Sequence, residues 1–533
     1  MQSSYTVTLE ALVIFFCALI LFTIGLSHQE IIGFESRFYV FALEMVQHGM
    51  SWFPTTYLQP YPDYPVTPTI FIYLASKIGG SLNKLTAVLP SAIAAAGTVS
   101  FTFLIGALHE RRWGLSAVFF MLLTYTFLME ARTISPDQYV TFATVCCFYL
   151  VYSAERLQQP ARVYWMPLVL FFGFACRGPI GLVIPAGVVC VFYGLDTQFK
   201  KMIVWGVISL SVLALGCVLL CLIAYHVGGF PFVLNVWHMQ VAGRLQDAYL
   251  PWYFYFSDSI GSYALTYPLA IAVVVGLFRS FIKNTSTQVE LMQKLVGWLV
   301  IILIGLSIPA GKKPRYVLAM VPALSLICGY LVMIQTQENY LGYLRKLVYL
   351  VCFLFPAVSL FCLIAGYYLG PRTHWLAQID FLNVGIIFFI LQCISYWVWK
   401  KFPTQHFLIL GVAACVFVVF YMGVIEPVNL VTNKTHDFVN EIEKMRHLEK
   451  AQLIFYQENP DGLPIKYLAN TTRDDEPVFI DSPNQLTNYN KKAVVVVTKE
   501  NFLHIPIGIV KTFKVVQSGN IGHAQVYVLE KMN

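Results

Sequence analysis

The sequence predicts an α-helical protein that crosses a membrane many times and ends in a small soluble α/β domain. Hydrophobic residues make up 58% of the 533 residues, charged residues only 12%, and the mean hydropathy is +0.66. A soluble globular protein has about twice that charged fraction. Apolar stretches that can cross a hydrocarbon core of about 30 Å recur up to residue 428, whereas the remaining residues are polar and rich in turn formers.

The apolar stretches predict about thirteen transmembrane helices, several of them short. They lie near residues 11–27, 86–108, 113–131, 137–153, 163–176, 180–196, 204–226, 262–279, 294–309, 316–335, 347–369, 379–400 and 405–425. The first stretch is too long, and too poorly flanked by basic residues, for a cleaved signal peptide. We therefore expect it to be a membrane span.

Lysine and arginine gather in alternate loops, as in the pairs Arg111 and Arg112, Lys200 and Lys201, and Lys400 and Lys401. Cytoplasmic loops carry the excess of these residues, so this side is predicted to face the cytoplasm. The transmembrane domain, residues 1–428, then places its loops 28–85 and 227–261 outside the cell (inner) membrane. Topology explains most of the net charge of +7, so nucleic-acid binding is not needed to account for it.

Residues 429–533 are predicted to form an extracytoplasmic (periplasmic) α/β domain. Helical spacing at 438–448 is followed by short apolar runs at 452–456, 477–480, 493–497 and 525–529. About a hundred residues suffice to bury a core. The segment has no phosphate-binding glycine loop and no obvious triad. We expect a structural or acceptor-docking role for it rather than catalysis.

Cations interrupt the apolar pattern at places predicted to lie outside. Arg177, followed by Gly178 and Pro179, separates two apolar runs, and a guanidinium at membrane depth costs about 2.5–3.5 kcal/mol unless it has a partner. We therefore expect an anionic group beside it. A second outer arginine is Arg244. A basic turn runs against the inside-positive trend and is explained by a phosphate or by generic lipid contact; it contains Lys312, Lys313, Arg315 and Tyr316.

Acids occur on the same predicted side. Glu35 and Arg37 precede a helical stretch, residues 38–50. Either this stretch presents its polar edge to a membrane-level cavity, or its charged residues only keep a loop helix in contact with water. Asp63 lies in a stiff proline-rich segment, where it binds a cation or a sugar hydroxyl, or caps a turn. Asp137 opens a span, either as part of a helix cap or as part of a site shared with Glu35 and Arg177.

The order of these motifs resembles the GT-C glycosyltransferases of the protein mannosyltransferase superfamily, most closely the branch of the bacterial lipid A aminoarabinose transferases. The resemblance covers about residues 10–330, and its motifs are short but ordered. The matching segments are Glu35-Ser36-Arg37-Phe38, Glu44-Met45, residues 49–54, Asp137, Arg177-Gly178-Pro179 through Pro185, Arg244, and Lys312 through Tyr316 and Leu318. Phe34 replaces the first acid of the family's acidic pair, and Tyr64 replaces the lysine of its Glu-Lys-Pro-Pro.

The resemblance implies transfer of one sugar from a polyprenyl-phosphate donor to a lipid A-like lipid or a protein acceptor at the extracytoplasmic face. Glu35 and Asp137 would orient the acceptor, and either could act as base if the nucleophile is a hydroxyl. A phosphate acceptor would need no base. The substrate-binding residues would be Arg37, Asp63, Tyr64, Arg177, Arg244, Lys312, Lys313, Arg315 and Tyr316.

Three questions stay open at this level. Asp63, with Glu35 or His238, could hold a divalent metal ion, which the sequence does not establish. A lipid-linked sugar transporter or flippase would also need intramembrane charges and broken spans. The departures at Phe34 and Tyr64 also fit a non-catalytic member of the family.

Overall fold

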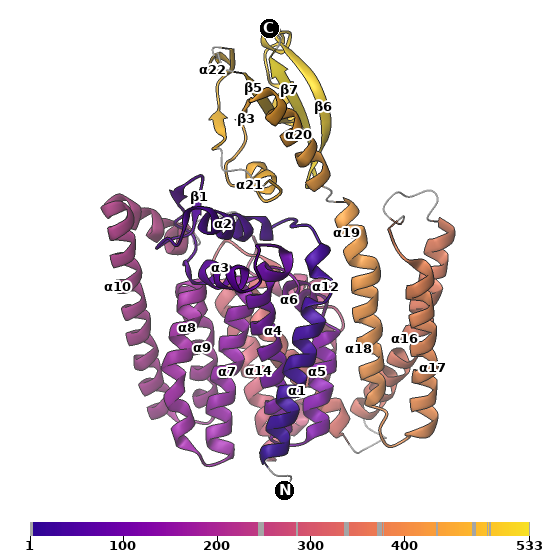
Figure 1. Ribbon diagram of the computed structural model, residues 1–533. Coiled ribbons are helices and arrows are strands. Elements are labelled where there is room, and N and C mark those ends of the chain that lie inside the picture. Colours follow the sequence, from indigo (N-terminus) through magenta and orange to yellow (C-terminus); the bar gives the residue numbers. More distant parts are fainter. Residues whose placement is uncertain are drawn as a thin grey trace.

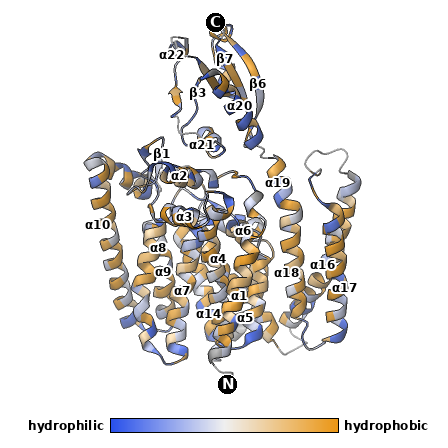
Figure 2. Ribbon diagram, in the orientation of Figure 1, coloured by the Kyte–Doolittle hydropathy of each residue, from blue (hydrophilic) through white to orange (hydrophobic). Residues whose placement is uncertain are grey.

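The computed structural model describes residues 4–243, 250–283, 286–334, 340–369, 376, 378–432, 435–471, 476–487, 489 and 492–531. Most of the chain forms a body of roughly aligned helices, and a small domain with a β-sheet stands at one end of it (Figure 1). Hydrophobic residues run along the helices of the body, and hydrophilic residues gather toward its two ends (Figure 2). This distribution is the one expected of a body surrounded by lipid.

The body contains helices of 7 to 39 residues, most of which are rich in apolar residues. They are α1 (Ser4–Thr23), α4 (Lys84–Ala107), α5 (Arg111–Leu122), α6 (Tyr125–Ala131), α7 (Pro136–Arg156), α8 (Met166–Arg177), α9 (Pro179–Leu195), α10 (Phe199–Trp237), α12 (Phe254–Ser262), α13 (Thr266–Lys283), α14 (Thr287–Ser307), α15 (Val321–Gly329), α16 (Tyr340–Leu369), α17 (Phe381–Lys401), α18 (Leu408–Phe420) and α19 (Glu426–Thr432). Single-turn and irregular helices join some of them: η1 (Leu26–His28), η2 (Pro160–Trp165), η3 (His238–Ala242), η4 (Pro314–Met320), η5 (Tyr330–Met333) and η8 (Tyr421–Ile425).

Within the described residues, 8 helices are long and apolar enough to cross a membrane, or up to 10 if each sharply bent helix pair is one span. The protein is thus a multi-pass helical membrane protein, as the sequence predicts. Helices α7, α8 and α9 are not in that count, although they pack in the middle of the body. The larger number of spans predicted from the sequence stays a prediction.

A layer of short elements lies between the helical body and the sheet domain (Figure 1). It contains α2 (Glu35–His48), a hairpin of β1 (Thr55–Thr56) and β2 (Gln59–Pro60), and α3 (Thr67–Ile78). Tyr57 and Leu58 at the hairpin turn both have left-handed φ angles, 55° and 59°. Glu44 of α2 accepts their backbone N–H groups at 2.6 and 3.3 Å, which stabilises this strained turn. Burial raises the pKa of the Glu44 carboxyl above its usual range.

The C-terminal domain is built on a mixed sheet in the order β4-β3-β5-β7-β6. The strands are β3 (Gln452–Tyr456), β4 (Val478–Ile480), β5 (Ala493–Thr498), β6 (Phe513–Ile521) and β7 (Ala524–Lys531). β3 pairs in parallel with β4 and β5, and β7 pairs antiparallel with β5 and β6. Both faces of the sheet are covered, with helices α20 (His436–Glu449), α21 (Leu463–Leu468), α22 (Pro483–Thr487), α23 (Lys499–Leu503) and α24 (Ile507–Val510) around it.

Candidate functional site

Arg177 is placed by a sharp break between α8 and α9. Gly178 ends α8 and precedes α9 with φ 69° and ψ −154°, a conformation that a residue with a side chain rarely adopts. A Cβ on this glycine would also lie 2.7 Å from the Oε1 atom of Gln240. Because Arg177 is the last residue of α8, its positive charge also lies at the negative end of the helix dipole.

The guanidinium of Arg177 pairs with Asp137 in the first turn of α7. Arg177 Nε lies 3.2 Å from Asp137 Oδ1, and Arg315 Nε of η4 lies 3.3 Å from Asp137 Oδ2. Arg177 and Asp137 are each only 6% exposed. Asp137 is therefore the anionic partner that the sequence requires for Arg177. The N-cap of α7 is Ser135, which makes no side-chain capping bond, so Asp137 bridges two arginines rather than capping this helix.

Two stacked tyrosines continue from Arg177 toward the C-terminal domain. The guanidinium carbon of Arg177 lies 4.9 Å from the ring centre of Tyr64, and Tyr64 stacks on Tyr61 with centroids 6.3 Å apart. Arg37 approaches the ring of Tyr61 at 5.4 Å. Asp461 then holds this column from the C-terminal domain, since it accepts the Tyr61 hydroxyl at 3.1 Å and its carbonyl accepts Arg37 at 3.0 Å. Tyr64, at the position of the family's lysine, thus supports an arginine.

A cavity of about 250 Å³ lies beside Arg177. Its polar wall contains Asp63, Arg177, Gln240, Tyr255 and Tyr316, and its apolar wall contains Pro179, Ile180, Val183, Val241, Leu306 and Pro309. The ring centre of Tyr316 lies 5.8 Å from the Arg177 guanidinium. Val183 is 52% exposed, so the apolar wall reaches the outer surface of the helical body. The cavity joins a cation to a lipid-facing apolar surface, and we call it the arginine cavity.

The basic turn before η4 contributes its residues unequally. The ammonium of Lys312 donates to the carbonyl oxygens of Leu250 and Pro309 at 3.1 and 2.7 Å, and this lysine is buried. Lys313 is exposed, and its ammonium lies 5.7 Å from the ring centre of Phe34. The guanidinium of Arg315 packs over the same ring at 3.5 Å. Phe34, which replaces an acid of the family, therefore supports two of the three cations.

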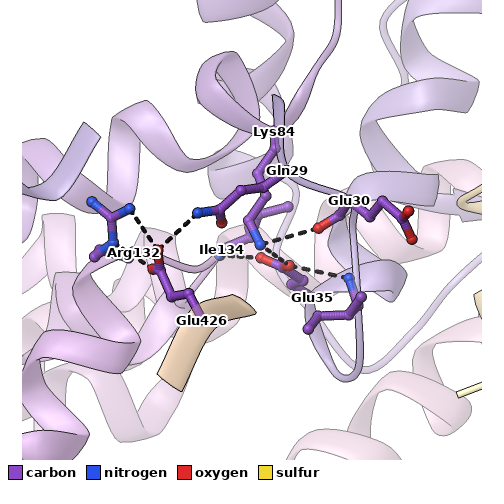
Figure 3. A network of polar contacts seen from close by, with 8 residues as sticks. Gln29, Glu30, Glu35, Lys84, Arg132, Ile134 and Glu426 are labelled. Carbon is purple, nitrogen blue, oxygen red and sulfur yellow. Dashed lines mark hydrogen bonds and ion pairs between the residues drawn. The ribbon is translucent and has the colours of Figure 1, made fainter. Parts of the chain in front are cut away.

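Glu35 lies in a different polar cluster, shown in Figure 3. Its carboxylate is 2.8 Å from the Lys84 ammonium and accepts the backbone N–H groups of Ile32 and Ile134 at 3.2 and 3.3 Å. Nearby, Arg132 forms a bidentate ion pair with Glu426 at 2.6 and 3.0 Å (Figure 3). The structure thus gives the two predicted carboxylates different partners: Glu35 pairs with a lysine, and Asp137 pairs with two arginines.

This cluster borders a second cavity, of about 330 Å³, at the junction with the C-terminal domain. It is lined by Gln29, Ile32, Gly33, Phe34, Glu35, Lys84, Met129, Glu130, Arg132, Thr133, Ile134, Arg315, Tyr421, Glu426, Asn429, Leu430 and His523. We call it the junction cavity. Arg315 lines this cavity and also pairs with Asp137, so the Asp137–Arg315 ion pair lies between the two cavities.

Other expectations from the sequence have different outcomes. Arg244 lies outside the described residues. No group of three His, Cys, Asp or Glu side chains in the described ranges could hold a metal ion, and Glu35 is bound to Lys84. The donor set of Asp63 with Glu35 or His238 therefore does not fit a divalent ion. Lys84, Glu426 and Asp461 were not among the residues predicted from the sequence. A lysine at the start of one apolar helix and an acid at the end of another each indicate that a group of opposite charge lies nearby. The sequence does not show which residue that group belongs to.

Comparisons with known proteins agree with this fold. Residues 63–221, which include Asp63, Asp137 and Arg177, match the family described as dolichyl-phosphate-mannose-protein mannosyltransferase. An uncharacterized protein of Aquifex aeolicus (strain VF5) is 24% identical over 336 residues, which cover 59% of this chain and 72% of that protein.

Two crystal structures of ArnT from Cupriavidus metallidurans, one apo and one bound to undecaprenyl phosphate, match with a TM-score of 0.70 and 15% identity. Each match covers 98% of both chains. The resemblance seen in the sequence motifs is thereby confirmed. Residues 63–221 thus match the protein mannosyltransferase family, and the whole chain is similar in fold to ArnT.

Proposed function

We propose that this protein transfers a single sugar from a polyprenyl-phosphate donor to a lipid or protein acceptor at the extracytoplasmic face of the membrane. The observation that carries the proposal is the buried Arg177–Asp137–Arg315 cluster beside a cavity whose apolar wall reaches the lipid-facing surface. The undecaprenyl phosphate bound in the ArnT structure supports a prenyl phosphate as the donor's carrier.

The charge of the cluster suits such a donor. Two guanidinium groups and one carboxylate leave one positive charge, which balances the single negative charge of a sugar phosphodiester. When the bond between the sugar and the phosphate breaks, the departing phosphate gains negative charge. Arg177, with the ring of Tyr316 near it, would stabilise that charge more strongly in the transition state than in the bound donor.

The apolar wall would take the first isoprene units. Ile180 and Val183 of α9 line the arginine cavity together with Leu306 and Pro309, and the exposed Val183 connects this apolar wall to the lipid-facing surface. A phosphate near Arg177 would therefore leave its hydrocarbon chain among these residues and in the bilayer. Burial of each methylene group contributes about 0.8 kcal/mol to binding.

The remaining predicted residues take supporting roles in the proposal. Both oxygens of Asp137 lie near arginine nitrogens, which suits a group that orients Arg177 and Arg315. Glu35 positions the start of α2 through Lys84. Arg244 and Lys313 stay predicted phosphate ligands. The ammonium of Lys312 already has two carbonyl partners, so it suits a structural role.

The Arg177→Ala variant tests the proposal. It should lower sugar transfer by about 100-fold or more, because a preorganised cation at the leaving group is lost. Arg156→Ala is the matched control, since Arg156 is exposed at the opposite end of α7. Transfer is read by mass spectrometry of lipids and glycoproteins from gene-deleted cells that express each variant at equal levels. Unchanged product with Arg177→Ala would sink the proposal. Binding of the sugar donor by the wild-type protein without any transfer product would favour a transporter instead.

A further inference from the structure

The junction cavity contains one acid that differs from the others. Glu35 and Glu426 also line this cavity, and each is held by a cation, Lys84 or Arg132. No lysine, arginine or histidine nitrogen of the described residues lies within 4.0 Å of the Glu130 carboxylate. Its Oε2 atom accepts the hydroxyl of Ser135, and the residue is only 7% exposed. Glu130 is therefore a buried carboxylate that faces a cavity without an ion-pair partner in the described part of the chain.

Two ion pairs lead from the arginine cavity to the junction cavity. Asp137 forms an ion pair with Arg177, which lines the arginine cavity, and another with Arg315, which lines the junction cavity. The Nη2 atom of Arg315 is buried and has no hydrogen-bond partner among the described residues. A ligand in the junction cavity would find a free N–H donor on this arginine and a free carboxylate oxygen on Glu130.

The charges in the junction cavity favour a neutral polar ligand. Lys84 is paired with Glu35 and Arg132 with Glu426, whereas the Nη2 atom of Arg315 has no hydrogen-bond partner among the described residues. The positive charge of Arg315 is in turn shared with Asp137. A phosphate acceptor would need more unpaired cations than this. The amide side chain of Gln29, the hydroxyl of Thr133 and the apolar side chains of Met129 and Leu430 suit a hydroxyl-bearing head group with an apolar extension.

We propose that the junction cavity binds the acceptor, a hydroxyl-bearing head group of a membrane lipid, and that Glu130 is the base that takes its proton. This inference rests on the transfer reaction proposed above. The hydroxyl oxygen forms the new bond to the anomeric carbon of the sugar, and its proton moves to the carboxylate of Glu130. The bond from that carbon to the phosphate oxygen breaks, and its electron pair leaves with the polyprenyl phosphate beside Arg177.

A lipid is favoured over a protein acceptor by the place of the cavity. Its walls come from α6 and α19 of the helical body, from the segment between η1 and α2, and from Lys84 at the start of α4, and His523 between β6 and β7 lines it from the C-terminal domain. Leu430 of α19 and Tyr421 of η8 give it an apolar side within the helical body. A lipid already lies at this level with its head group at the helix ends, whereas a peptide would have to pass between the two domains.

The test compares Glu130→Gln with Glu110→Gln, an exposed acid at the start of α5. Each variant is expressed in gene-deleted cells, where transfer is read by mass spectrometry. The purified full-length variants are then titrated with undecaprenyl phosphate. Glu130→Gln should lower transfer by about 100-fold or more and keep undecaprenyl phosphate binding, because it removes the base and not the donor site. Glu110→Gln should change neither.

Leu430→Trp, which fills the junction cavity, should likewise block transfer and keep undecaprenyl phosphate binding. Near wild-type transfer by Glu130→Gln would overturn the role of Glu130 while leaving the proposed function standing. A sugar found on proteins and not on lipids would overturn the lipid assignment. Loss of undecaprenyl phosphate binding in Glu130→Gln would mean that Glu130 belongs to the donor site, and would also overturn it. If the wild-type protein makes no product at all, the proposed function is wrong, and this inference, which rests on it, is wrong as well.

Discussion

At the scale of single residues, Tyr64 shows how this chain differs from the family motif. The motif predicts a lysine there, which would supply a positive charge to the phosphate. Tyr64 instead places its ring 4.9 Å from the guanidinium of Arg177 and stacks on Tyr61. A cation over an aromatic ring gains about 0.5–2 kcal/mol. In place of the lysine that the motif predicts, this chain has an aromatic ring that holds Arg177 in position.

Tyr64→Ala should therefore lower sugar transfer by roughly 2- to 30-fold, the factor that corresponds to the loss of this contact. Tyr64→Phe should keep most of the transfer, because the ring remains. Both are measured as initial rates with the amount of folded protein matched by size-exclusion chromatography. Equal losses in the two variants would show that the hydroxyl matters and the ring does not.

Sequence patterns at this scale predicted part of the candidate site. Asp137, Arg177, Arg315 and Tyr316 were all expected in it, and the structure brings them together. These residues were predicted from the family motifs, which occur in the same order along this chain. Glu130 could not be predicted in this way, because it differs from the other acids in having no ion-pair partner among the described residues. A sequence shows which residues are charged and leaves their partners open.

At the scale of elements, the patterns within one helix or strand were predicted and the contacts between elements were not. Short apolar runs between polar, turn-rich stretches indicated the strands that became β3, β4, β5 and β7. β6 (Phe513–Ile521) was missed, because much of this edge strand is exposed and its sequence lacks an apolar run. The Arg132–Glu426 ion pair joins residues 294 positions apart, so no local pattern could indicate it.

That ion pair fixes α19, which leads to the C-terminal domain, to the segment after α6. Glu426→Ala should destabilise the protein by about 3–5 kcal/mol, because it leaves a buried guanidinium without its partner. Glu10→Ala is the matched control, since Glu10 pairs with Arg111, whose side chain is 51% exposed, and should cost about 1 kcal/mol or less. Thermal unfolding of the purified proteins in detergent measures both. Similar midpoints for the two variants would argue against a structural role for the pair.

At the scale of the whole molecule, composition and hydropathy predicted the class of fold, and the structure confirms a multi-pass helical protein with a small mixed sheet near the C-terminus. The placement of the sheet domain on the extracytoplasmic side of the membrane stays a proposal that rests on the distribution of lysine and arginine. How the two parts meet could not be predicted, since only in the folded chain does Asp461 accept the Tyr61 hydroxyl and His523 line the junction cavity. The C-terminal domain therefore contributes both to the column of Arg177, Tyr64 and Tyr61 and to the junction cavity.

The most direct test of sugar transfer compares the masses of lipids and glycoproteins from cells with and without this gene. The proposed function predicts a product heavier by one sugar only in cells that express the protein, and the junction cavity predicts that this sugar lies on a lipid. The same masses in both kinds of cells, when the protein is present in the membrane and the polyprenyl-phosphate sugar is available, would contradict the account.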